Sequence, residues 1–136
     1  MSYTVWFYYF KDGSEKFYNE DGTIQIQTYE NGVLSKLQIF REDGTVQQIT
    51  TYENGDVTKV EGFREDGTLE QITTYENEVV SKIEVFREDG TLQKIQTYKN
   101  EVVSKVEFFR EDGTLEKIDR YERGVYLFSK KMKSIN

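Results

Sequence analysis

Short runs of alternating hydrophobic and polar residues, separated by turns that contain glycine, fill almost the whole chain. Within a run such as 79–86, β-branched and aromatic residues dominate, and a turn signal follows after about eight residues. Helices that short are marginal, whereas strands of this length are ordinary. The pattern therefore predicts about twelve strands, at residues 3–10, 15–18, 23–29, 33–40, 45–52, 56–63, 68–75, 79–86, 91–98, 102–109, 114–121 and 125–132.

The runs repeat with a period of 23 residues. Phe-Arg-Glu-Asp-Gly-Thr occurs at 40–45, 63–68, 86–91 and 109–114. Tyr-Glu-Asn-Gly alternates with it, intact in the first two copies and altered in the later ones, where Glu78 and Glu101 replace the glycine. Because Asp-Gly and Asn-Gly between β-formers are the strongest short-range hairpin signals, each period predicts two antiparallel hairpin turns.

The turns also predict a register. We expect a three-residue loop at 88–90 and a four-residue loop at 76–79. These loops together give the pairs Phe86 with Leu92, Ile83 with Ile95, Tyr75 with Val80, and Ile72 with Ile83.

One copy differs in length, because Gly22 to Tyr29 is one position shorter than the later copies. Either the first copy is regular and the others carry a β-bulge, or the first copy has a deletion that is absorbed locally.

Strand alternation distributes apolar and polar side chains to both faces of the predicted sheet. A sandwich needs one uniformly apolar face, so this pattern favours a single layer. The predicted fold is all-β, an open antiparallel β-meander built from 23-residue double-hairpin repeats. The alternative is a β-solenoid, which would stack the acidic turns at about 4.8 Å in a repulsive ladder.

We expect one repeat domain over 1–136. In this organisation a capping hairpin occupies 1–22, the repeats occupy 23–121, and a capping strand with a basic tail occupies 122–136. At the N-terminus, residues 3–10 have no charge and would form an unprotected sheet edge, whereas Lys130 and Lys131 protect the C-terminal edge.

Composition excludes several kinds of chemistry. The chain has no His and no Cys, so it has no imidazole base, thiolate nucleophile or disulfide. Its net charge of −7 argues against nucleic acid or an anionic membrane as the main partner. No apolar run approaches the roughly 20 residues of a membrane helix, and the N-terminal segment lacks the features of a signal peptide. Cytoplasmic residence is therefore the default expectation.

The repeat unit resembles a known family. Its pattern Tyr-Glu-Asn-Gly-Val-Leu-Ser-Lys-Leu-x-x-Phe-Arg-Glu-Asp-Gly-Thr is similar to the variant MORN repeats of bacterial proteins, over residues of roughly 18 to 128. Some of those proteins are antitoxin components, which the resemblance implies as one role. A weaker resemblance links the chain to the tyrosine–aspartate repeats of large bacterial proteins. The single Trp6 lies outside the repeats, unlike the Trp of the standard MORN unit.

The acidic turns are the first chemical candidates. Carboxylates recur as Glu-Asp pairs at 42–43, 65–66, 88–89 and 111–112. Calcium needs six to eight converging oxygens, and glycoside hydrolysis needs two carboxyls that face one cleft. One tight turn supplies neither, and Asp before Gly is what the turn itself requires. We therefore expect no metal, no cofactor and no enzymatic activity.

The aromatic residues are the second candidates. They recur at fixed positions beside the turns, where they gain buried area for a thin sheet and also leave apolar surface exposed. The candidate interaction surface consists of Trp6, Phe7, Tyr9, Tyr52, Tyr75 and Tyr98. Strand addition at residues 3–10, to a partner or to a second copy, is one hypothesis, and a simple cap at that edge is the alternative.

The leading functional hypothesis is a non-catalytic repeat module with an extended sheet surface for protein–protein interaction. A structural, self-assembling repeat protein is the second hypothesis. A carbohydrate-binding module that uses the tyrosine row is the third. Partner capture, concentration-dependent oligomers and glycan binding distinguish the three.

Overall fold

The computed structural model describes residues 3–6 and 13–133. They belong to two compact units that meet in sequence between Thr68 and Leu69, called unit 1 and unit 2 here. Unit 1 holds β1 (Tyr3–Trp6), β2 (Gly13–Tyr18), β3 (Ile24–Glu30), β4 (Val33–Phe40), β5 (Val46–Glu53) and β6 (Asp56–Phe63). Unit 2 holds β7 (Leu69–Glu76), β8 (Val79–Phe86), β9 (Leu92–Lys99), β10 (Val102–Phe109), β11 (Leu115–Glu122) and β12 (Val125–Lys131).

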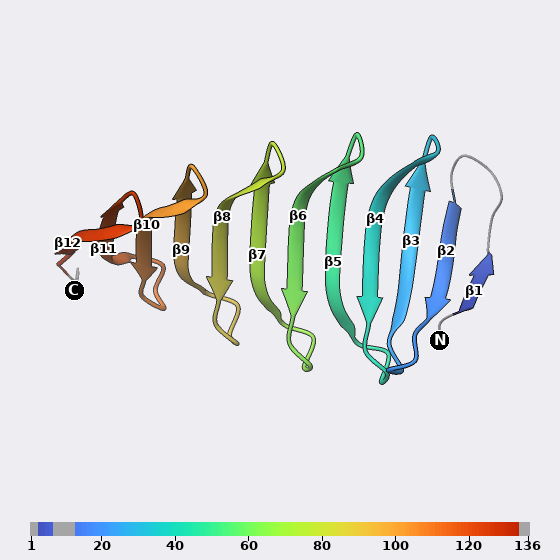
Figure 1. The fold of residues 1–136 in the computed structure, drawn as a ribbon. Helices are drawn as coiled ribbons and strands as arrows, with labels where there is room; N and C mark the ends of the chain where they lie inside the picture. Colours follow the sequence, from blue (N-terminus) through green and yellow to red (C-terminus); the bar gives the residue numbers. More distant parts are fainter. Residues whose placement is uncertain (1–2, 7–12, 134–136) are drawn as a thin grey trace. The chain divides into compact units, whose positions relative to one another are not determined.

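Each unit is an open, single-layer meander. Within a unit every strand pairs antiparallel with its neighbours in sequence, and no second layer covers either face of the described strands (Figure 1). The predicted all-β meander is confirmed, and the solenoid alternative, which needs parallel stacking, is wrong. Observed strand bounds lie within two residues of the predicted ones, except in the first strand, where residues 7–12 lie outside the described part. The single-domain organisation with capped ends stays a prediction.

A one-residue β-bulge shifts the register beside each Asp-Gly turn of unit 2. Phe86 pairs with Leu92 as predicted, but Val85 then pairs with Lys94, which leaves Gln93 as the extra residue. The predicted pair of Ile83 with Ile95 is therefore wrong, because Ile83 faces Gln96. Between β2 and β3, by contrast, the register runs without a shift. The shorter first copy is thus the regular one, and the later copies carry the bulge.

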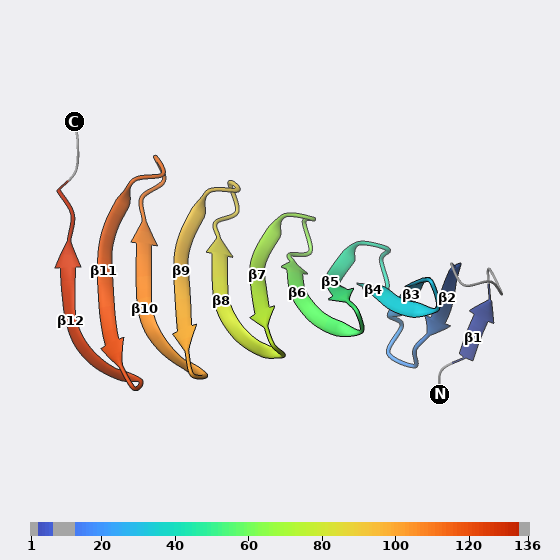
Figure 2. The same ribbon diagram turned by 90° about the horizontal axis from the view of Figure 1, so that it is seen from above.

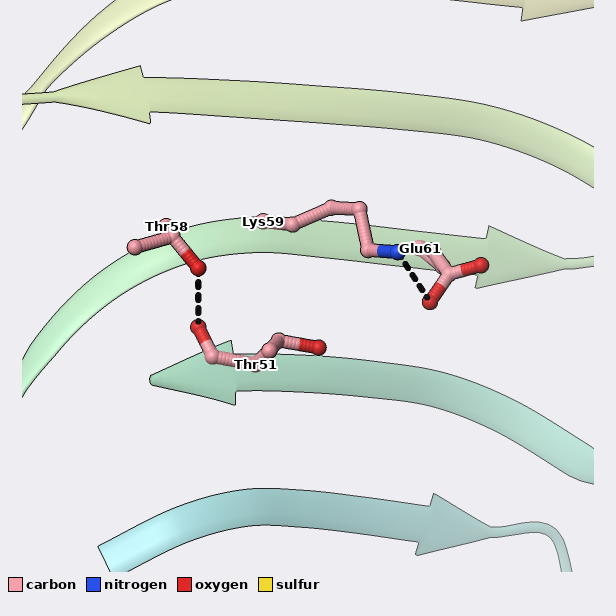
Figure 3. Close-up of polar contacts among 4 residues, drawn as sticks. All are labelled: Thr51, Thr58, Lys59 and Glu61. Atoms are coloured by element: carbon pink, nitrogen blue, oxygen red, sulfur yellow. Dashed lines mark hydrogen bonds and ion pairs between the residues drawn. The ribbon is translucent and has the colours of Figure 1, made fainter. Parts of the chain in front are cut away.

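A second bulge lies near each Asn turn. Tyr75 pairs with Val80 as predicted, but Thr74 pairs with Lys82, so Ser81 is the extra residue and Ile72 faces Glu84 instead of Ile83. The Ser81 hydroxyl donates a hydrogen bond to the Thr74 carbonyl at 3.2 Å. Thr58 donates the equivalent bond to the carbonyl of Thr51 at 3.3 Å (Figure 3). Bulges bend strands and increase their twist, and the strands curve along their length in Figure 2.

The Asn turns are tighter than predicted. Glu76 and Val79 form a cross-strand pair, so the loop contains two residues, Asn77 and Glu78, rather than four. Both residues have positive φ, 51° and 68°, as a type I′ hairpin turn requires. The prediction failed because a two-residue turn and a four-residue turn give the same pairing of Tyr75 with Val80.

Both faces of the sheet stay thinly covered. On one face, odd-numbered strands carry isoleucines next to acidic residues of the even-numbered strands, as in the row Ile72, Glu84, Ile95, Glu107 and Ile118. On the opposite face, apolar residues of even strands alternate with polar residues of odd strands. Only Thr50, Thr73 and Val106 are buried among the described side chains, and each lies in a central row of the corresponding face of its own unit.

Candidate interaction surfaces

The tyrosines of the candidate surface lie near the ends of odd strands, next to the Asn turns. Tyr52, Tyr75 and Tyr98 are half-buried, and each pairs across the hairpin with a valine, namely Val57, Val80 and Val103 respectively. Tyr75 and Tyr98 belong to unit 2, on alternate strands, and Tyr52 belongs to unit 1. An aromatic ring beside a β-branched neighbour is a favourable cross-strand pair, so part of each ring serves the sheet itself.

Two tyrosines of this repeated position, Tyr52 and Tyr121, border hollows beside the turns. In unit 1, Tyr52 lines a hollow of about 420 Å³ together with Leu34, Asn31 and Asn54. In unit 2, Tyr121 lines a larger groove of about 800 Å³. The ring of Tyr121 also meets that of Tyr126 edge-on, with 5.7 Å between the ring centres. Tyrosine rings thus contribute apolar surface to concave parts of both units.

The N-terminal candidates are only partly described. Trp6 ends β1, where its backbone pairs with Glu15 of β2. Phe7 and Tyr9 lie outside the described residues. The hypothesis that residues 3–10 form an association edge therefore stays a prediction.

The C-terminal edge is less protected than predicted. Lys130 and Lys131 do lie in β12, but they occupy only its second half. The first half exposes four consecutive apolar side chains, with exposed fractions of 64% for Val125, 54% for Tyr126, 50% for Leu127 and 52% for Phe128. Comparison of the 23-residue copies could have revealed this surface, because Leu127 and Phe128 replace the Ser104 and Lys105 of the preceding copy.

The aspartates of the acidic turns hold the turns together. In each Glu-Asp-Gly turn the Asp carboxylate accepts hydrogen bonds from the backbone N–H and the hydroxyl of the threonine two residues later; for Asp89 and Thr91 the distances are 2.9 and 2.6 Å. The hydrogen bond from the Thr91 hydroxyl is the largest cause, and that from the Thr91 backbone N–H the second, of a pKa for Asp89 below its ordinary value. The pKa values of Asp43, Asp66 and Asp112 are lowered for the same reasons.

An arginine opens each of these turns, and Arg41, Arg87 and Arg110 each connect two hairpins. The Arg110 guanidinium donates to Leu115 O at 2.8 Å and to Met132 O at 2.6 Å. The Arg87 guanidinium donates likewise to Leu92 O and to Phe109 O. Arg41, Arg87 and Arg110 therefore each donate to a backbone carbonyl 22 residues ahead, at or just beyond the end of an even strand, and so satisfy an acceptor of the next hairpin.

The acidic side chains of the described residues do not converge. No group of three or more carboxylates in 3–6 and 13–133 is arranged to hold a metal ion. Lysines instead pair with glutamates two residues along the same strand, as with Lys59 and Glu61 at 3.5 Å (Figure 3). Such exposed pairs contribute at most about 1 kcal/mol each. In the part of the chain that the structure describes, no helix is long and apolar enough to cross a membrane.

Solved structures resemble this fold at low sequence identity. One is a mutant of Staphylococcus aureus TarM in complex with fondaparinux, α-GlcNAc-glycerol and UDP, with 14% identity over 73% of this chain and a TM-score of 0.57. Another is accessory secretory protein 1, 2 and 3 of Streptococcus pneumoniae, with 22% identity over 74% of this chain and a TM-score of 0.51. This chain spans 20% of the length of each. These likenesses concern the fold alone.

Comparison with sequences points to the repeat. No curated protein sequence matches the chain. A family model described as "MORN repeat variant" matches residues 11–31 and 82–100. The second match runs from the middle of β8, through the Asp-Gly turn and β9, to Asn100 at the next turn. Two segments of the chain therefore match the variant MORN repeat, and each contains one Asp-Gly hairpin turn with the following odd strand.

Proposed function

We propose that the chain is a non-catalytic repeat module that binds a partner protein through the tyrosine-lined hollows of its sheet. The observation that carries the proposal is the position of these rings. Tyr52 and Tyr121 lie half-buried in concave surface beside the turns, and Tyr75 and Tyr98 are half-buried at the equivalent repeat positions, where no second layer covers the described strands. Partly exposed apolar surface of this kind commonly marks a contact site, and tyrosine is among the residues most enriched in contact sites.

The repeat architecture supports the same proposal. Variant MORN repeats match two segments, and Asp-Gly turns of the same sequence recur in the other copies. Repeat arrays generally use an extended surface, in which each unit contributes one part of the contact. An antitoxin component is a specific form of this proposal, in which the partner is a toxin; co-purification of the two chains would test that form.

The test compares partner capture by three forms of the full chain. The first is the wild type, and the second carries Tyr52→Thr, Tyr75→Thr and Tyr98→Thr, which keep a β-forming residue in each strand. The matched control carries Gln47→Thr, Glu70→Thr and Gln93→Thr, at exposed positions near the opposite ends of the same strands. Circular dichroism establishes that each form keeps its β structure.

We expect a partner from a lysate of the source organism to bind the wild type and the control, and to be lost from the tyrosine variant. Equal capture by all three forms would contradict the role of the tyrosines. Glycan-array binding that only the tyrosine variant loses, without a captured protein, would replace the proposal with a carbohydrate-binding module. Concentration-dependent oligomers without any captured protein would replace it with a self-assembling protein.

A further inference from the structure

The last strand departs from the repeat in a way that changes its surface. Twenty-three residues earlier, β10 has Ser104, Lys105, Val106 and Glu107, where β12 has Leu127, Phe128, Ser129 and Lys130. The exchange places large apolar side chains in water and removes the branched residue that is buried in β10. A strand that served only to end the sheet would gain nothing from this pattern, because exposed apolar residues promote association.

The exposed side chains border a groove of unit 2. Leu127 and Phe128 line the groove of about 800 Å³, on the side opposite β9. Four of its lining residues are cationic and one is acidic, in a chain whose net charge is −7. Lys105, Arg120 and Phe128 follow one another in a single register row across β10, β11 and β12. The groove thus joins apolar surface to local positive charge.

Among the described strands, β12 has a paired neighbour on one edge only, and its outer edge presents backbone groups that no described strand pairs. In β10 the corresponding edge pairs with β11, whereas β12, the last strand of unit 2, pairs only with β11 among the described residues. The end of β12 is held in place, since Met132 N donates to Glu116 O at 2.7 Å and Met132 O accepts from Arg110. An extended segment could therefore add to this edge with little reordering of β12.

The lysines of β12 favour an added strand that carries negative charge. Lys131 already has Lys117 as its cross-strand neighbour on β11. Lys130, the residue before it, lies on the face opposite to that of Lys131 and Ser129. Lys131 of β12 corresponds in the repeat to Phe108 of β10, which pairs with Lys117 of β11. A further strand with the sequence of β11, added at the outer edge, would therefore place a lysine beside Lys131. Like charges in adjacent positions are unfavourable, whereas carboxylates beside Lys130 and Lys131 are favourable.

We propose that the outer edge of β12 and its groove bind an extended acidic segment of a partner protein by antiparallel strand addition. Two adjacent carboxylates of the segment lie beside Lys131 and Lys130, and an apolar side chain lies against Phe128. An anionic membrane offers the same charge but no backbone to pair with the strand edge. This inference rests on the proposed function and specifies the surface and the chemistry of the partner.

The test uses the synthetic peptide Thr-Glu-Glu-Thr-Phe-Thr-Val-Thr. In the antiparallel register its two glutamates face Lys131 and Lys130, and its phenylalanine faces Phe128. The first comparison peptide has Lys-Lys in place of Glu-Glu. The second keeps every side chain but carries N-methyl groups on alternate backbone nitrogens, which removes the donors of one edge. Binding to the full chain is measured by fluorescence anisotropy, and phosphatidylserine vesicles are tested by co-sedimentation.

The protein variants test separately whether binding depends on the charge of the edge, on the apolar contact, or on the net charge and fold of the protein. Lys130→Glu with Lys131→Glu reverses the charges of the edge, and Phe128→Ser removes the apolar contact. The matched control, Lys36→Glu with Lys59→Glu, makes the same change of net charge in unit 1. Circular dichroism establishes that each variant keeps the β content of the wild type.

We expect the acidic peptide to bind the wild type and the control, and binding to weaken by about tenfold or more in each β12 variant. The Lys-Lys peptide should prefer the charge-reversed variant, and the N-methylated peptide should bind none of the forms. Equal binding of the N-methylated peptide would overturn strand addition. Vesicle binding that depends on Lys130 and Lys131, without peptide binding, would overturn a protein partner at this edge. If no peptide binds but tyrosine-dependent capture persists, this proposal falls and the proposed function stands.

Discussion

Residue identity at the second position of each two-residue turn, four of which begin with Asn and one with Arg123, sets a local conformational cost. Gly32, Gly55 and Gly124 occupy this position with φ between 78° and 88°, where glycine has no Cβ penalty. Glu78 and Glu101 occupy it with φ of 68°. A left-handed conformation costs a residue with a side chain roughly 1–2 kcal/mol, so two turns of unit 2 are strained relative to the other three.

We therefore expect Glu78→Gly and Glu101→Gly to stabilise the protein. The gain should be about 0.5–1 kcal/mol for each, because the relief of strain exceeds the greater entropy that glycine has in the unfolded chain. Differential scanning calorimetry would show a higher melting temperature. Gly55→Glu makes the reverse change in an equivalent turn, where open space surrounds the missing Cβ, and should be destabilising by a similar amount. A lower melting temperature for the glycine variants would contradict the argument.

The aspartates of the acidic turns should give the fold a measurable pH dependence. Their pKa values in the folded state lie below the ordinary 3.8, because the threonine two residues later donates two hydrogen bonds to the charged form. A lowered folded pKa contributes stability that is present above the unfolded pKa and is lost as the pH falls through the folded pKa.

Replacement of Asp43, Asp66, Asp89 and Asp112 by Asn should reduce this loss. Asparagine keeps an acceptor oxygen for the threonine but does not titrate. The urea midpoint of the wild type should fall as the pH is lowered from about 5 to about 2, and that of the variant should fall less. Equal slopes for the two proteins would show that other carboxylates account for the acid sensitivity.

At the scale of the element, the bulges determine which residues share a face. Each hairpin of unit 2 has one extra residue near its turn, so the odd and even strands change register twice in every repeat. The hydroxyl of Ser81 or its equivalent satisfies a carbonyl at one bulge, and an arginine satisfies carbonyls near the other. The hairpins are therefore held by side chain to backbone bonds as well as by the ladder.

Loss of the bulge hydroxyl should destabilise the hairpin. We expect Ser81→Ala to cost about 1 kcal/mol, since the Thr74 carbonyl loses its side-chain donor. Ser81→Thr is the matched control, because Thr58 already makes this bond in β6. Urea denaturation followed by circular dichroism measures both. A Ser81→Ala variant as stable as the wild type would mean that water replaces the hydroxyl without cost.

At the scale of the whole molecule, contacts between strands are local. Among the described strands of each unit, a strand contacts only those next to it in sequence, and the turns, bulges and arginine contacts recur at the 23-residue period. Stability should then be close to a sum of terms for each repeat and for each interface between neighbours.

Deletion of residues 64–86, one complete period, should accordingly leave a shorter protein that is folded and soluble. The deletion joins Phe63 to Arg87, so the new turn has the same sequence as the one it replaces. Size-exclusion chromatography and circular dichroism would measure solubility and β content. Aggregation of the deleted form, with a soluble parent, would show that the repeats are not interchangeable.

Local chemistry made much of this fold predictable. The Asp-Gly and Asn-Gly signals, with about eight β-forming residues between them, determine hairpins through interactions within a few residues of each turn. The strands, the meander and the pairing of Tyr75 with Val80 were therefore predicted correctly. The one-residue difference between the first copy and the later copies indicated a bulge, but did not locate it.

The tertiary structure decided what depends on contacts between distant residues. The bulges at Ser81 and Gln93 changed the predicted isoleucine pairs, because carbonyl contacts with side chains such as Arg87 accompany the shifted register. Lysines near the C-terminus suggested a protected edge, and the folded unit placed the apolar residues of β12 beside a cationic groove, a position that comparison of the copies does not give. Sequence periodicity determines the strands and their order, whereas the groove of unit 2 depends on how side chains from four strands converge.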